Sequence, residues 1–108
     1  MTGGTRGIGF AIARRFAREG GEVIIVSRRK DNVQKAHEAI EKAGGKITSY
    51  VAHFGKKEDR LRVHGEIKKK FGKLDVLVAN IAASLHVGRQ LNITERAYDK
   101  MWEINVKS

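Results

Sequence analysis

The first residues of the chain form a glycine-rich turn suited to binding phosphate. Residues 2–9 have the sequence TGGTRGIG. Glycine adopts positive φ without strain and has no Cβ, so backbone N–H groups at such a turn can approach a phosphate at a helix N-terminus. The turn therefore predicts nucleotide binding. The residues expected to contact the nucleotide are Thr2, Gly3, Thr5, Arg6, Gly7, Ile8 and Gly9.

Apolar spacing predicts a helix directly after this turn. Ile8, Ala11, Ile12 and Phe16 recur at helical intervals, so we expect them to form its buried face. The pair of glycines at 20–21 then ends the helix.

Short apolar strands and amphipathic helices alternate along the rest of the chain. Residues 23–26 form the continuous apolar run VIIV, which is typical of a strand covered on both faces. Val33, Ala36, Ile40 and Ala43 then share one helical face. The predicted strands are 22–27, 47–52 and 74–79, and the later helices are 31–43, 57–71 and one that starts near Thr94.

This alternation predicts an α/β fold of the Rossmann type, a doubly wound parallel sheet in one partial dinucleotide-binding domain, residues 1–108. Only Met1 precedes the glycine turn, so we expect the first strand and the C-terminal half of such a domain to be missing. In strand order 3-2-1-4 the first strand is central, and its loss is expected to weaken the sheet.

The composition is basic and free of cysteine. The 108 residues carry a formal net charge of +10, and the absence of cysteine excludes disulfides and thiolate zinc sites. No apolar run is long enough to span a membrane, and the four histidines lack metal-ligand spacing, so we expect no metal site. The lysines and arginines are spread over several helices, which favours solvated surfaces, although a nucleic-acid-binding surface stays an alternative.

The pattern TGxxxGxG, with Thr2, Gly3, Gly7 and Gly9, resembles the glycine motif of the short-chain dehydrogenase/reductase family. The resemblance covers essentially the whole chain and implies a nicotinamide dinucleotide cofactor. Where NAD enzymes of this fold place a carboxylate, this chain has residues 27–29, Ser-Arg-Arg. Guanidinium groups bind a 2′-phosphate, which favours NADP(H). The residues expected to select it are Ser27, Arg28 and Arg29, with Arg6 as a second cation.

Two further segments match the family in part. Asn80 and Ala82 follow the family's NNAG pattern beside the cofactor, whereas Ala79 and Ile81 depart from it. The family's adenine-contacting aspartate is replaced here by His53, followed by Phe54. These features most resemble the branch of NADP-dependent retinol and carbonyl reductases.

The resemblance implies one catalytic residue in this chain. Asn105 matches the family's asparagine, which holds a water in the proton relay; the alternative is an asparagine bonded to backbone. Its helical neighbours Tyr98, Met101 and Trp102 predict a buried, apolar setting. The family's serine, tyrosine and lysine have no counterpart, so we expect no hydride transfer by this chain alone.

The sequence thus predicts the cofactor-binding half of an NADP(H)-dependent oxidoreductase that reduces carbonyls or oxidises alcohols such as a ketone, aldehyde or retinoid. A non-catalytic NADP-binding or interaction module is the alternative. For the whole enzyme we expect a small carbonyl or alcohol substrate, homo-oligomers, no nucleic-acid or membrane partner, and a cytoplasmic or peroxisomal location.

Overall fold

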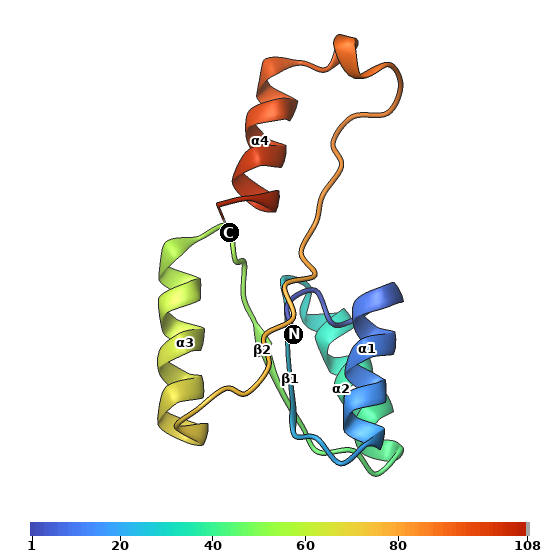
Figure 1. Ribbon diagram of the computed structural model, residues 1–108, viewed down its shortest axis with the longest axis vertical. Coiled ribbons are helices and arrows are strands. Elements are labelled where there is room, and N and C mark those ends of the chain that lie inside the picture. Colours follow the sequence, from blue (N-terminus) through green and yellow to red (C-terminus); the bar gives the residue numbers. More distant parts are fainter. Residues whose placement is uncertain (108) are drawn as a thin grey trace.

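The computed structural model describes residues 1–107 and shows helices alternating with strands (Figure 1). The elements are α1 (Gly7–Arg18), β1 (Val23–Ser27), α2 (Lys30–Lys42), β2 (Ile47–Val51), α3 (Lys57–Phe71), the 3-10 turn η1 (Gln90–Asn92) and α4 (Glu95–Asn105). The predicted helices and first two strands are confirmed, with ends shifted by one or two residues.

β1 and β2 form a parallel sheet that two further segments extend. Val23 to Ser27 of β1 align with Ile47 to Val51 of β2. On the other edge of β1, the Val26 N–H donates to the Met1 carbonyl at 3.0 Å. The Thr2 N–H in turn donates to the Val78 carbonyl at 3.0 Å. The spatial order is therefore β2, β1, the N-terminal residues and the segment around Val78, an incomplete Rossmann-type α/β sheet.

The prediction of a strand over 74–79 is wrong. This segment is not a strand, and within residues 1–107 its only backbone hydrogen bond to the sheet is the one at Val78. A strand forms by pairing with a neighbour. Residues 74–77 form no such pairing among residues 1–107, so no strand forms there.

Helices cover the two faces of the sheet (Figure 1). Ile25 points to the side of α1 and α2, where it is buried with Ala13 and Ile40. Ile24 and Val26 point to the other side, where Val63 of α3 covers them. This alternation is why the apolar run of β1 is continuous, since both of its faces are buried.

The buried face of α1 differs from the predicted one. Gly9, Ala13 and Ala17 are buried, whereas Ile8 is 75% exposed and Phe16 is 43% exposed. Glycine and alanine have little or no side chain, so α1 can approach β1 closely along this face. The larger apolar residues are left at the rim of the contact.

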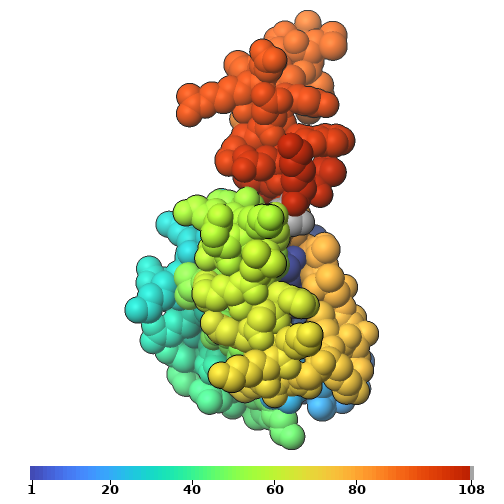
Figure 2. Space-filling view, turned by 90° about the vertical axis from the view of Figure 1, so that its left-hand side faces the viewer, coloured from blue at the N-terminus to red at the C-terminus, as the bar shows by residue number. Residues whose placement is uncertain are grey.

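The last part of the chain stands apart from the sheet. The segment through η1 and α4 projects beyond the carboxyl end of the strands, and a narrow neck separates it from the body (Figure 2). The molecule is accordingly elongated, 47 × 26 × 24 Å. Across residues 1–107, no helix combines the length and apolar character that a membrane span requires.

Candidate functional site

A cavity of about 250 Å³ lies at the carboxyl end of the strands. In parallel α/β sheets, ligands bind at this end. Ten of the sequence-predicted contacts line the cavity: Gly3, Thr5, Arg6, Ser27, Arg28, Arg29, His53, Phe54, Asn80 and Ala82. The other predicted residues do not line it: Thr2, Gly7, Ile8, Gly9 and Asn105.

The first turn of α1 has the properties of an anion-binding helix end. Gly7 opens the helix with φ +55°, a conformation that favours glycine. Arg6 precedes the helix without a side-chain cap, and the first turn contains no acidic residue. The first helical N–H groups and the positive end of the helix dipole are therefore left for an external anion.

Gly9 and Asn80 pack the glycine turn against the sheet. The Asn80 side-chain amide donates to the Gly3 carbonyl at 3.2 Å. A Cβ at Gly9 would collide with that same carbonyl and with the Asn80 amide nitrogen. Gly9 is therefore required for close packing, and Asn80 holds the turn in place.

Thr2, predicted as a cofactor contact, is buried and supports the turn from behind. Its hydroxyl donates to the Val78 carbonyl at 3.3 Å and accepts from the Asn80 N–H at 3.1 Å. Thr2 does not line the cavity, and neither do Gly7, Ile8 and Gly9.

Three arginines make the rim of the cavity basic. Arg6, Arg28 and Arg29 are exposed, and within residues 1–107 none of them forms an ion pair with a carboxylate. In the described part of the chain, residues 1–107, no aspartate or glutamate lines the cavity. Ser27 joins the glycine turn to this rim, because the Thr5 hydroxyl donates to its hydroxyl at 3.4 Å. The rim thus offers guanidinium donors that no carboxylate side chain of residues 1–107 neutralises.

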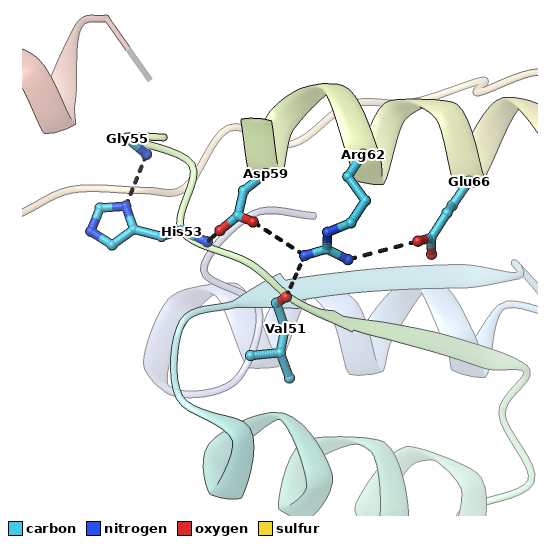
Figure 3. Close-up of polar contacts among 6 residues, drawn as sticks. All are labelled: Val51, His53, Gly55, Asp59, Arg62 and Glu66. Atoms are coloured by element: carbon cyan, nitrogen blue, oxygen red, sulfur yellow. Dashed lines mark hydrogen bonds and ion pairs between the residues drawn. The ribbon is translucent and has the colours of Figure 1, made fainter. Parts of the chain in front are cut away.

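The loop after β2 is held by a network of polar contacts (Figure 3). The Asp59 carboxylate accepts from the His53 N–H at 2.7 Å. The Gly55 N–H donates to His53 Nδ1 at 3.1 Å, which fixes the ring. The Arg62 guanidinium donates to the Val51 carbonyl at 2.9 Å and contacts Asp59 at 3.4 Å. His53 therefore reaches the cavity from a braced loop.

Asp59 is the anionic centre of this network. The hydrogen bond from the His53 N–H, together with Arg62, lowers the pKa of the Asp59 carboxyl below its ordinary value. The ionised form is the one that accepts these hydrogen bonds. The network is therefore strongest when the Asp59 carboxyl is ionised.

Asn105 lies outside the cavity and pairs with backbone. Its Oδ1 accepts from the Ala83 N–H at 2.7 Å, and its Nδ2 donates to the Ala83 carbonyl at 3.0 Å. The predicted buried, apolar setting is wrong, because Asn105 and Trp102 are exposed; α4 instead buries Ile104, which lines the cavity. The pairing fastens α4 to the segment that follows Asn80.

Sequence reasoning missed several lining residues. Asn32 lies one helical turn beyond Arg29 at the start of α2, so its spacing from the arginine pair was a usable signal. Ile81 and Ile104 carried no such signal, because they reach the cavity only through the tertiary structure. In the part of the chain that the structure describes, no cluster of potential ligands for a metal ion is present.

Comparison with known proteins adds an independent observation. The sequence profile of the short chain dehydrogenase family matches residues 1–108. The chain belongs to the short-chain dehydrogenase/reductase family. It is 42% identical over 108 residues to dehydrogenase/reductase SDR family member 4 of Homo sapiens, and 41% identical to a tropinone reductase-like protein of Erythroxylum coca. The alignments cover all of this chain but only 39% and 42% of those two relatives.

Solved structures share the fold of this chain. An actinorhodin polyketide ketoreductase with NADPH superimposes with a TM-score of 0.91 at 24% identity, over 98% of this chain and 40% of the other. A metagenomic short-chain oxidoreductase in complex with NADP gives a TM-score of 0.89 at 26% identity, over 98% and 48%. The family binds a nicotinamide cofactor, and this chain corresponds to its N-terminal, cofactor-binding region.

Proposed function

We propose that this chain is the NADP(H)-binding part of a short-chain reductase that exchanges a hydride between the nicotinamide and a small carbonyl or alcohol. The observation that carries the proposal is the basic rim, where Arg6, Arg28 and Arg29 line a cavity that no aspartate or glutamate of residues 1–107 lines. A carboxylate would accept the ribose hydroxyls of NAD and repel a 2′-phosphate, whereas guanidinium groups favour that phosphate.

The residues present fit such a dinucleotide. The uncapped start of α1 suits the pyrophosphate. Gly9 has no Cβ, so it leaves space for the glycine turn to approach the pyrophosphate. The arginine pair after β1 suits the 2′-phosphate. His53 and Phe54 line the same cavity and are the residues proposed to contact the adenine. When bound, NADPH would supply the hydride for the reaction.

Calorimetry of the 108-residue chain with NADPH and NADH tests the cofactor preference. We expect tighter binding of NADPH, because each charge-assisted hydrogen bond to the 2′-phosphate contributes about 1.5 to 3 kcal/mol. Arg28→Ala and Arg29→Ala should each weaken NADPH binding about tenfold or more and leave NADH binding nearly unchanged. Equal affinities of the unaltered chain for the two cofactors would contradict the proposal.

Arg14→Ala is the matched control. Arg14 is an exposed arginine of α1 that does not line the cavity. Its removal lowers the net charge by the same amount, so any effect of overall charge alone would appear in this variant as well. We expect it to bind both cofactors like the unaltered chain, and circular dichroism should show all variants equally folded.

A further inference from the structure

His53 meets the cofactor cavity with one of its ring nitrogens already bonded. The Gly55 N–H donates to His53 Nδ1 at 3.1 Å, and the His53 N–H donates to the Asp59 carboxylate at 2.7 Å (Figure 3). These two contacts hold both the ring and the backbone of His53. His53 and Gly55 both line the cavity, so the ring is positioned before any ligand binds.

The contact between the ring and position 55 requires glycine. A Cβ at Gly55 would lie 2.8 Å from His53 Cε1 and 3.1 Å from His53 Nδ1, so a larger residue would push the ring away. Gly55 does not have a positive φ. Close approach of the ring, and not an unusual backbone conformation, is therefore what calls for glycine here.

This contact also determines which ring nitrogen carries the proton. A backbone N–H can only donate, so His53 Nδ1 must accept and is unprotonated. In the neutral ring the proton then lies on Nε2. Within residues 1–107, Nε2 has no hydrogen-bond partner and is not sealed from solvent. His53 therefore presents an N–H donor to a ligand in the cavity.

A purine base can meet such a donor only through its acceptors. Adenine has acceptors at its ring nitrogens, whereas its exocyclic amino group is a donor and cannot accept from Nε2. Hypoxanthine has an oxygen in place of that amino group, an acceptor like O6 of guanine. A carboxylate would have the opposite preference, but none of the carboxylates of residues 1–107 lines the cavity.

We propose that His53 recognises the purine of the dinucleotide by donating Nε2–H to an acceptor of the base, so that the cavity binds a hypoxanthine dinucleotide at least as well as the adenine one. The inference rests on the proposed function, because the base must lie beside His53. It extends the ligand class beyond adenine. His53 is then a specificity-determining residue, and Gly55 is a positioning residue that fixes its tautomer.

Calorimetry tests the preference with NADPH and deamino-NADPH, in which hypoxanthine replaces adenine. At about pH 8, where histidine rings in general are neutral, we expect the unaltered chain to bind deamino-NADPH as tightly as NADPH or more tightly. His53→Asp should reverse this order and bind NADPH about tenfold more tightly, because a carboxylate accepts from the amino group and repels the oxygen. A preference of the unaltered chain for NADPH would overturn the proposal, and so would an unchanged ratio in His53→Asp.

His64→Asp is the matched control. His64 is an exposed residue of α3 that does not line the cavity, and its substitution changes the net charge by the same amount. The ratio of the two affinities should stay as in the unaltered chain. Circular dichroism should show both variants folded.

Long-range proton–nitrogen NMR reads the His53 ring directly and needs neither a variant nor a ligand. We expect the proton on Nε2 in the free chain at about pH 8, and Gly55→Ala should lose this preference between the tautomers. A proton on Nδ1 would overturn the inference even in a chain that binds NADPH more tightly than NADH. No binding of NADPH or of deamino-NADPH would instead contradict the proposed function, and this inference with it.

Discussion

The two edges of β1 have different surroundings. One edge is paired with β2 along all five residues, from Val23 to Ser27. Within residues 1–107 the other edge is bonded only by Met1 and Gly3, at Ile24 and Val26, and below them it borders a second cavity of about 340 Å³. Both edges belong to the same apolar run, so the apolar sequence does not determine how far each edge is paired. The extent of pairing is determined by whether a neighbouring segment lies beside that edge.

The site at the carboxyl end depends on the short paired stretch. Gly3 donates to the Val26 carbonyl at 2.9 Å, and Thr2 links Val78 to Asn80. These contacts set the glycine turn beside the basic rim. The cavity is therefore formed even though the sheet below it is only partly paired.

Shortening a buried side chain of β1 and an exposed side chain of the segment 74–79 should give the largest difference in the free energy of unfolding. Ile25 is fully buried, and Ile25→Ala should lower the free energy of unfolding by about 2 to 5 kcal/mol. Leu77 is 68% exposed, so Leu77→Ala should change the free energy of unfolding by less than about 0.5 kcal/mol. Urea unfolding measures both. A comparable loss in the two variants would show that the Leu77 side chain is packed in solution.

Substitution of Gly9 should disrupt the cofactor turn more than the sheet. Gly9→Ala places a methyl group against the Gly3 carbonyl and the Asn80 amide, so the turn must shift. We expect at least about a tenfold loss of NADPH affinity, from displaced N–H donors. Gly65→Ala is the control, because a Cβ there meets nothing within 4 Å. If Gly9→Ala bound NADPH normally, the turn would not depend on close packing.

In a polypeptide that begins at Met1, the buried N-terminal ammonium predicts that the free energy of unfolding depends on pH near neutrality. Its pKa lies below the ordinary 8.0, so the folded chain binds fewer protons than the unfolded chain just below that pH. The free energy of unfolding should therefore rise as the pH increases through this window toward 8.0. The N-acetylated chain is the control, and the difference between the two forms isolates this group. A difference that falls with pH would contradict burial of the ammonium group.

The Asp59 carboxyl predicts a smaller pH dependence of the free energy of unfolding, in acid. Because its pKa is lowered, its contribution is present above the ordinary value of 3.8 and is lost as the pH falls through the lower, folded pKa. Asp59→Asn should remove this part of the pH dependence, seen as the difference between the two chains in urea unfolding from about pH 6 to pH 2. Its NADPH affinity at neutral pH should fall by less than about tenfold, because Arg62 still holds Val51. Identical pH profiles of the two chains would show that the polar network around Asp59 makes no net contribution to stability.

The amino-acid sequence by itself determined the local features of this protein. Helical and strand periodicity placed α2, β1 and α3, because burial of one face or of both faces imposes a spacing that can be recognised locally. The glycine turn and Arg28 with Arg29 were recognisable for a similar reason, since their chemistry lies in residues close together in the chain.

Only the tertiary structure decided which residues are buried and which find a hydrogen-bonding partner. It buried Ala13 rather than Phe16, left 74–79 without strand pairing, paired Asn105 with Ala83 and brought Ile104 to the cavity. Each of these outcomes depends on a partner distant in the sequence. Periodicity in the sequence shows which apolar residues share one face of a helix or strand. Burial of that face also requires another segment to pack against it.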